Sequence, residues 1–290
     1  MYVLVCPCIA DPSLRARGIT TDEDLQSFSR ALERCRHFGV EAVLLPCPET
    51  LHLGRDREPG PFHPRLDTPE FTALLDRLGS GVREEIRSRG DAPLCIIGVD
   101  SSPACGAEWH DFGTAEGKPS RRPGRGAFLS RFPGIRAIDV KDFARYRVYL
   151  AGPLFSEAER AFNRTLRDLL QAHLFRVYLP QEAAEAPARE PYADGAIYGS
   201  HVAALQQTDV VVAVCDGPDA DSGTAWEMGY ATARGIPVMA LRTDSRWFNT
   251  ERRLNLMLER SAARVLTTPE MLPAALRSPF CGPAGEPPAG

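Results

Sequence analysis

The stretch DVVVAVCDGPDADSGTAWEMGYA, residues 209–231, decides the fold of the C-terminal half of this chain. Its first six residues form an apolar, β-branched run, which is typical of a strand buried on both faces of a parallel sheet. An acidic, glycine-bearing loop follows, and a helix is expected from Thr224 to the breaker Gly235-Ile236-Pro237, after which VMAL predicts another strand. Loops at the carboxyl ends of parallel strands line the ligand crevice of such sheets. The carboxylates of Asp221 and Glu227 are therefore expected to lie together at the opening of this crevice.

The preceding sequence continues the alternation of strands and helices. VYLAG (148–152) predicts a strand, and EAERAFNRTLRDLLQA (157–172) has apolar residues at helical spacing, with Ser156 as N-cap and Glu159 completing a capping box. FRVYLP predicts a second strand, and a helix from about Ala196 to Gln207 leads into the strand at Asp209. This βαβαβ order predicts a Rossmann-like or flavodoxin-like doubly wound domain. No G-x-G-x-x-G follows its first strand, so we expect no cofactor for this domain.

Length and composition predict two α/β domains, each built on a parallel sheet. The chain has 290 residues, and about 150 residues per domain is a common size. The Pro/Gly/Arg-rich segment GKPSRRPGRG is interpreted as a solvated linker at the end of the first domain, with an anion-binding patch as the alternative. We expect domains at residues 1–144 and 145–277, followed by a disordered tail at 278–290.

Charge and hydropathy exclude several classes of partner. The net charge is −4 without a long basic block, so we expect no nucleic-acid partner. The first residues, MYVLVCPC, lack the features of a signal peptide, and no apolar run approaches the roughly 20 residues of a membrane span. A cytoplasmic protein that does not contact a membrane is expected. Its eight cysteines are then reduced thiols or metal ligands.

Four motifs in the second half resemble the nucleoside deoxyribosyltransferase family: VYLAGPLFSEAER, LPQE, DSGTAWEMGYA and LNLML. The resemblance implies that Glu227 attacks the anomeric carbon of a deoxynucleoside and expels the base, and that the sugar then passes to another base or to water. It also implies that Asp221 contacts the sugar hydroxyls and that Tyr149 orients the nucleophile. Departure of a base builds oxocarbenium charge that a carboxylate can capture, as in retaining glycosidases.

The same resemblance implies a set of substrate-binding residues and a homo-oligomer. Asn255 and Met257 are expected to reach into the site of a neighbouring subunit, which makes the protein at least a dimer. The substrate-binding residues implied are Gly152, Phe155, Gln181, Gly223, Asn255 and Met257.

His201 departs from the family pattern. Eight residues before Asp209 the family usually has an acidic residue that handles the proton of the base, and this chain has His201. Either His201 takes the acid/base role, which a pKa near neutrality permits, or the leaving group differs. The alternative is a histidine on the surface of a helix.

Three cysteines of the first half follow strand-like runs. Cys8, Cys47 and Cys105 come after YVLV, EAVLL and CIIGV, so they converge on one edge if these strands share a parallel sheet. Gathered thiolates suit a soft metal or an iron–sulfur cluster, and three ligands leave a coordination position open. The alternative is that they are small buried apolar residues, as we expect for Cys35, Cys95 and Cys215.

The segments CIADPSLRARG, LPCPE and SSPACG resemble the thiouracil desulfidases. The resemblance implies a [4Fe–4S] cluster on Cys8, Cys47 and Cys105, which removes sulfur from thiolated pyrimidines. It also implies that Glu49 and Ser102 are the acid/base residues beside the open iron. Cys6 offers a second thiol for the first position; Cys8 is preferred because its spacing to Arg15 and Gly18 follows the family pattern.

Together these features predict an enzyme that acts on modified, thiolated nucleosides, with cleavage or transfer at the base–sugar bond and desulfuration of the base. One alternative is a glycosyl transferase or N-glycoside hydrolase whose N-terminal domain is a regulatory module without a cluster. The other is a non-enzymatic nucleotide sensor, in which Tyr149, Asp221 or Glu227 would be expected to be absent. A small-molecule nucleoside or nucleobase is the expected substrate in each case.

Overall fold

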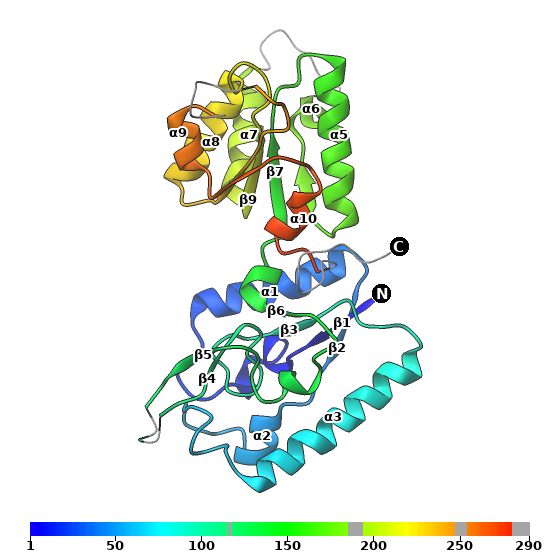
Figure 1. Cartoon of the computed structure of the whole chain (residues 1–290), viewed down its shortest axis with the longest axis vertical. Coiled ribbons are helices and arrows are strands. Elements are labelled where there is room, and N and C mark those ends of the chain that lie inside the picture. The colour runs from blue at the N-terminus through cyan, green and yellow to red at the C-terminus, as the bar shows by residue number, and fades with distance from the viewer. Residues whose placement is uncertain (115, 117, 185–193, 247–253, 280–290) are drawn as a thin grey trace. The chain divides into compact units, whose positions relative to one another are not determined.

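The computed structural model describes the whole chain except residues 115, 117, 185–193, 247–253 and 280–290 (Figure 1). The chain divides into two compact units, one built on Met1–Arg145 and one on Tyr146–Ser278. Each unit is an α/β structure around its own parallel sheet. The expected disordered tail at 278–290 lies almost wholly outside the described residues. No helix within the described ranges is long and apolar enough to cross a membrane.

The C-terminal unit contains a parallel five-stranded sheet in the order β11-β10-β9-β7-β8. This is the flavodoxin-like order, so the predicted doubly wound fold is confirmed. The order reverses between β7 and β9, and the carboxyl ends of these two strands form the switch point where such sheets bind ligands. The strands are β7 (Arg147–Ala151), β8 (Arg176–Tyr178), β9 (Val210–Val214), β10 (Val238–Leu241) and β11 (Arg264–Leu266).

Helices cover both faces of this sheet. Helix α5 lies on one face and α7 and α8 lie on the other, as Figure 1 shows. The predicted capping box of α5 is confirmed, because Ser156 and Glu159 exchange side-chain and backbone hydrogen bonds. Helix α8 begins at Ser222, two residues before the predicted start, because Asp221 provides its N-cap. The helices are α5 (Glu157–Ala172), α6 (Pro180–Ala184), α7 (Asp194–Gln207), α8 (Ser222–Ala233), α9 (Leu256–Ser261) and α10 (Met271–Ala275).

The N-terminal unit contains a parallel four-stranded sheet in the order β2-β1-β3-β6. Helix α1 lies on one side of this sheet, and α2 and α3 lie on the other (Figure 1). The strands are β1 (Tyr2–Val5), β2 (Glu41–Leu44), β3 (Ile96–Gly98) and β6 (Ala137–Asp139). The helices are α1 (Asp22–His37), α2 (Pro48–Leu53), α3 (Pro69–Arg89) and α4 (Val140–Phe143). Short 3-10 turns lie at Pro7–Ile9, Pro12–Leu14 and Leu129–Arg131.

Part of the segment interpreted as a solvated linker is ordered structure of the N-terminal unit. Strand β5 (Arg121–Pro123) pairs antiparallel with β4 (Trp109–Asp111). Phe128 and Leu129, which follow this segment and were expected to pack on the first domain, are fully buried. Arg121 and Arg122 are exposed, and backbone pairing with β4 orders them. Arg125 is half-buried and donates to the carbonyl of Phe132 at 2.6 Å, so a segment with the composition of a linker belongs to the folded unit.

Candidate functional site

The carboxylate of Glu227 and the hydroxyl of Tyr149 form the centre of the C-terminal site. Tyr149 lies in β7 at the switch point, and its hydroxyl donates a short hydrogen bond to Oε1 of Glu227 on α8. The ring of Tyr149 is fully buried, and its register neighbours are Tyr178 of β8 and Val211 of β9. The structure therefore brings together two of the residues that the sequence selected.

Burial brings the pKa of the Glu227 carboxylate close to neutral pH. Desolvation raises the pKa of Glu227 from 4.5 to about 7, against the hydrogen bond from Tyr149, which lowers it, while the nearby charge of Asp221 raises it further. Desolvation, together with the charge of Glu227 and the hydrogen bond to it, raises the pKa of Tyr149 far above its usual value. Tyr149 therefore remains a hydrogen-bond donor at any physiological pH. A carboxylate whose pKa lies near the working pH suits nucleophilic or acid/base chemistry.

Asp221 stands at the N-terminus of the helix that carries Glu227. Its Oδ2 accepts hydrogen bonds from the backbone amides of Gly223 at 2.9 Å and Thr224 at 3.2 Å, so the side chain caps α8. A Cβ at Gly223 would lie 3.0 Å from this same oxygen, which explains a glycine at that position. Oδ1 accepts no hydrogen bond within the described ranges and is available to a ligand. Asp221 thus fixes the helix and presents a carboxylate beside Glu227.

Hydrogen bonds between two loops support this site. Asp216, in the loop after β9, accepts from the amide and the hydroxyl of Thr243, each at 2.6 Å, in the loop after β10. Gly217 donates to Asp244 at 2.7 Å, and the buried guanidinium of Arg242 donates to the carbonyl of Cys215. The start of the loop that leads to Asp221 is therefore held against the loop after β10.

His201 lies on α7, and the structure places Tyr178 between it and Tyr149. The rings of Tyr149 and Tyr178 stack with their centroids 5.2 Å apart and an interplanar angle of 21°. The His201 ring meets Tyr178 edge-on at 6.0 Å and 79°. Burial lowers the pKa of His201, so its imidazole is neutral at neutral pH. The acid/base role of His201 stays a prediction, and the structure adds Tyr178 as a neighbour.

Tyr178 was not selected from the sequence, although the sequence contains a signal for it. VYL occurs twice, at 148–150 and 177–179, and these segments pair in register, Val148 with Val177 and Tyr149 with Tyr178. Identical residues at paired positions of neighbouring parallel strands point to the same face of the sheet. The repeat therefore indicated two adjacent tyrosines, once the pairing of these strands was known.

The remaining residues implied by the resemblance lie in different environments. A Cβ at Gly152 would meet Val214 at 3.2 Å, which explains a glycine between β7 and β9. Phe155 is 73% exposed in the loop after β7. Gln181 is buried; its oxygen accepts from Asn163 at 3.2 Å and its nitrogen donates to the carbonyl of Arg160 at 3.0 Å. The amide of Gln181 thus fixes α5 against α6, and its contact with substrate stays a prediction.

Asn255 and Met257 lie at the start of α9, which packs beside α8. Asn255 accepts from the amide of Met257 at 2.9 Å and caps the helix, and the Met257 side chain is 73% exposed. An apolar side chain of that exposure is available to another molecule. The part of the preceding loop at 247–253 lies outside the described residues.

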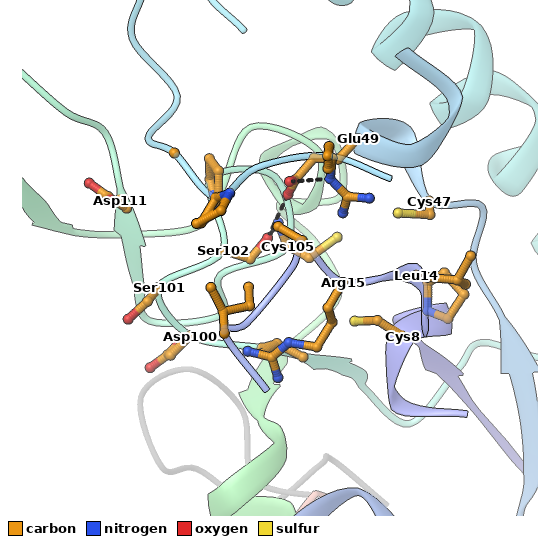
Figure 2. Close-up of a pocket in the computed structure, with 18 of the residues that line it drawn as sticks. Cys8, Leu14, Arg15, Cys47, Glu49, Asp100, Ser101, Ser102, Cys105 and Asp111 are labelled. Carbon is orange, nitrogen blue, oxygen red and sulfur yellow. Dashed lines mark hydrogen bonds and ion pairs between the residues drawn. The ribbon is translucent and has the colours of Figure 1, made fainter. Parts of the chain in front are cut away.

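The second site is a cavity of about 310 Å³ at the carboxyl ends of β1, β2 and β3. Cys8, Cys47 and Cys105 line it, and their sulfur atoms point into the same space from three different loops (Figure 2). The predicted convergence of the three cysteines on one sheet edge is therefore confirmed. Cys35, Cys95 and Cys215 are buried elsewhere.

The thiols around this cavity influence one another. Burial, followed by the charges of Cys105 and Cys47, raises the pKa of Cys8. A hydrogen bond to Cys6, and then burial, raises the pKa of Cys105 well above its usual value. Cys6 is fully buried beneath Cys105, whereas Cys8 lines the cavity. Of the two thiols of CPC, Cys8 thus faces the cavity.

Glu49 and Ser102 also meet at this cavity. The Ser102 hydroxyl donates to Oε1 of Glu49 at 3.0 Å and accepts from the amide of Cys105 at 3.0 Å (Figure 2). The guanidinium of Arg57 lies 3.6 Å from Oε2 of Glu49. A carboxylate and a hydroxyl that are linked in this way can pass a proton to or from a molecule in the cavity.

Arginines that were not selected from the sequence form part of the cavity wall. Arg15, Arg57 and Arg65 line it, and each has a buried guanidinium nitrogen without a hydrogen-bond partner in the described part of the chain. Glu49, Asp100 and Asp111 also line the cavity and offset this positive charge. The cavity therefore offers both donors and acceptors to a polar ligand.

Among the described residues, no group of three or more His, Cys, Asp or Glu side chains has the arrangement that a metal ion requires. A single ion draws its thiolate ligands to about 2.3 Å from one atom. An iron–sulfur cluster attaches each thiolate to a different iron, so its ligands lie farther apart. The three thiols face one cavity but do not have the arrangement of a single-ion site.

Comparisons with known proteins assign the C-terminal unit. Residues 148–259 match the family model described as nucleoside 2-deoxyribosyltransferase. A conserved protein from Enterococcus faecalis V583 is 33% identical with a TM-score of 0.40, over 46% of this chain and 96% of that protein. The 2-deoxyribosyltransferase of Bacillus psychrosaccharolyticus is 22% identical with a TM-score of 0.39, over 43% of this chain and 89% of that protein.

The deoxyribosyltransferase of Leishmania mexicana is 22% identical with a TM-score of 0.36, over 42% of this chain and 91% of that protein. No curated protein matches the chain. The segment matched by the family model contains the Tyr149–Glu227 pair, its switch-point strands and the capping residue Asp221. Residues 148–259 of the C-terminal unit are therefore a nucleoside 2-deoxyribosyltransferase domain.

Proposed function

We propose that the C-terminal unit cleaves the N-glycosidic bond of deoxynucleosides through a covalent intermediate on Glu227 and passes the sugar to a second base or to water. The observation that carries the proposal is the desolvated Glu227 carboxylate, held by the Tyr149 hydroxyl at the switch point of the sheet. The family assignment supports glycosyl transfer on nucleosides.

The proposed reaction has two displacements at C1′ of the sugar. In the first, an ionised oxygen of Glu227 forms a bond to C1′ while the C1′–N bond breaks. The electron pair of the C1′–N bond leaves with the base, which takes up a proton. In the second, a nitrogen of another base or the oxygen of water attacks C1′ and releases Glu227 as a carboxylate, while the attacking group loses its proton. Two inversions retain the configuration at C1′.

The neighbouring residues have separate roles in this proposal. Tyr149 holds one oxygen of Glu227, which leaves the other to attack. Asp221 offers its free Oδ1 to a sugar hydroxyl, which fixes C1′ in front of the nucleophile. His201, Phe155 and Gln181 are proposed to face the base and the sugar.

A trapping experiment tests the nucleophile. Protein incubated with a deoxynucleoside and quenched in acid is digested, and peptides are searched by mass spectrometry for a deoxyribosyl adduct on Glu227. We expect the adduct on wild type and on Glu157→Gln, a change at an exposed glutamate of α5. Glu227→Ala should carry no adduct and should lose at least about 1000-fold in kcat/KM, because the covalent step has no nucleophile. Near-normal cleavage by folded Glu227→Ala contradicts the assignment.

We propose a second activity for the N-terminal unit, desulfuration of a thiolated nucleobase by a [4Fe–4S] cluster. The observation that favours it is the convergence of three cysteine sulfurs on one cavity beside Glu49 and Ser102. Cys8, Cys47 and Cys105 would hold the cluster, because cysteine sulfurs are the usual protein ligands of iron–sulfur clusters. When bound, the cluster supplies an open iron that accepts sulfur.

In this proposal Glu49 exchanges a proton with the base, Ser102 orients the Glu49 carboxylate, and Arg57 forms an ion pair with it. Both activities would then act on one thiolated nucleoside, which explains their presence in one chain.

Anaerobic reconstitution tests the cluster. Wild type should bind iron and sulfide and show brown iron–sulfur absorbance, and it should release sulfide from 2- or 4-thiouracil or their nucleosides. Cys47→Ala and Cys105→Ala should bind no cluster. Cys35→Ala, a change at a buried thiol of α1, should bind it as wild type does. If no variant differs from wild type and none binds iron, the N-terminal unit is a binding module without a cluster.

A further inference from the structure

Two buried polar atoms beside the Tyr149–Glu227 pair have no hydrogen-bond partner among the described residues. They are the hydroxyl of Tyr178 and Nε2 of His201. Buried polar groups in proteins are nearly always paired with protein atoms or with ordered water. Two unpaired groups on side chains that touch each other indicate a shared partner outside the chain.

The geometry directs the Tyr178 hydroxyl toward the catalytic centre. Tyr149 and Tyr178 occupy paired positions of neighbouring parallel strands, so their side chains rise from the same face of the sheet. Their rings are nearly parallel, with centroids 5.2 Å apart, so both hydroxyls point the same way. Since the Tyr149 hydroxyl reaches Glu227, the Tyr178 hydroxyl lies on the same side as the nucleophile.

Packing alone does not explain a tyrosine at this position. The Tyr178 ring fills the space between Tyr149 and His201, and a phenylalanine ring would fill it equally well. A buried hydroxyl without a partner is destabilising, so a phenylalanine would be the more stable choice in the chain alone. The hydroxyl is therefore explained by a contact that the described part of the chain does not supply.

The chemistry of the pair matches the edge of a nucleobase. A tyrosine hydroxyl donates and accepts hydrogen bonds, and Nε2 of a neutral imidazole does one or the other. Nucleobases present donors and acceptors side by side on their edges. Glu227, Tyr149, Tyr178 and His201 form a continuous row, with the nucleophile at one end and the two buried atoms without a hydrogen-bond partner at the other.

We propose that Tyr178 is a specificity-determining residue of this site, whose hydroxyl acts with Nε2 of His201 to hydrogen-bond the base of the nucleoside as it leaves. This inference rests on the proposed glycosyl transfer at Glu227. It assigns to β8 a base-recognition group next to the strand that orients the nucleophile.

The test compares Tyr178→Phe with wild type on two kinds of substrate. Deoxynucleosides need hydrogen bonds to the leaving base, whereas a 4-nitrophenyl 2-deoxyriboside releases a phenolate that needs neither a proton nor a base contact. We expect kcat/KM of Tyr178→Phe to fall about tenfold on deoxynucleosides, the effect of losing one hydrogen bond, and to stay unchanged on the nitrophenyl glycoside. Tyr198→Phe, at an exposed tyrosine of α7, is the matched control and should equal wild type on both.

Equal rates for Tyr178→Phe and wild type on every deoxynucleoside would overturn the proposal, as would equal losses on both kinds of substrate. Calorimetry with the free base adds a readout that needs no turnover. If wild type transfers no sugar and forms no adduct at Glu227, the proposed function fails. Weaker binding of the free base by Tyr178→Phe would then still support base recognition by Tyr178, and unchanged or absent binding would overturn it.

Discussion

The Glu227 carboxylate must be ionised to attack a sugar, yet its surroundings favour the protonated form. Burial raises its pKa to about 7, and the Tyr149 hydrogen bond opposes that rise. We therefore expect kcat/KM to increase with pH through a limb near 7, because only the ionised fraction reacts. The measurement is a pH profile of deoxynucleoside cleavage at substrate concentrations below KM. A limb near the ordinary glutamate value of 4.5 would show that Glu227 is not the group that titrates.

Tyr149→Phe removes the hydrogen bond that lowers the pKa of Glu227 and leaves the ring in place. The acidic limb of the pH profile should therefore move to higher pH, and kcat should fall because the carboxylate loses its orientation. Tyr198→Phe provides the control for a lost hydroxyl at an exposed position. If the limb of Tyr149→Phe stays at the wild-type pH, the Tyr149 hydroxyl does not influence the ionisation of Glu227.

The same desolvation means that the ionised form of Glu227 lowers the free energy of unfolding. Its folded pKa of about 7 exceeds its ordinary value of 4.5, so its contribution to stability is greatest at low pH and is lost as pH rises through this window. Glu227→Gln lacks the charge and should raise the free energy of unfolding at pH 8 by at most about 3 kcal/mol, and by less than about 1 kcal/mol at pH 5. Urea denaturation at the two pH values measures this difference. A gain that is equal at both would indicate that ionisation is not its cause.

At the scale of elements, Asp221 combines capping of α8 with proximity to Glu227. Asp221→Asn keeps an oxygen that caps the helix and loses the charge, whereas Asp221→Ala loses both. We expect Asn to preserve stability, and Ala to lower it by about 1 kcal/mol. Both should lower kcat/KM if the carboxylate binds the sugar. Full activity in Asp221→Asn would leave Asp221 with its capping role alone.

The strands and helices of the C-terminal unit could be predicted because short local sequence patterns indicate them. DVVVAV is apolar throughout, and the capping box at Ser156 and Glu159 marks the start of α5. Strand β5 could not be predicted in this way, because Arg121 and Arg122 are exposed and only backbone pairing with β4 makes them a strand.

The partners of the predicted site residues depend on tertiary structure. Tyr178 could be identified only from its register with Tyr149, and the arginines of the N-terminal cavity only from the fold that brings them to one wall. In contrast, the convergence of Cys8, Cys47 and Cys105 could be predicted, because the carboxyl ends of parallel strands meet at one edge whatever their sequence separation.

At the scale of the molecule, each unit has its own sheet and its own candidate site, so damage to one site should leave the other working. Cys47→Ala is expected to lose iron and sulfide release while it keeps deoxynucleoside cleavage. Glu227→Gln is expected to show the reverse. Both activities are measured on the same anaerobic preparation of the full chain. Loss of both activities in either single variant would show that the two sites depend on each other.

The last prediction concerns assembly, because Met257 is 73% exposed at the start of α9 and Asn255 caps that helix beside α8. We propose that these residues complete the site of a neighbouring subunit, so the protein should sediment as a dimer or a larger oligomer. Glu227→Ala and Asn255→Ser should each be impaired alone; serine is chosen because it still caps α9.

When the two variants are dissociated, mixed and reassembled, part of the activity should return, since some sites then receive an intact Glu227 from one subunit and an intact Asn255 from another. A mixture of two different Glu227 variants is the control and should stay inactive. Full activity in a strictly monomeric species would show that one chain supplies the whole site.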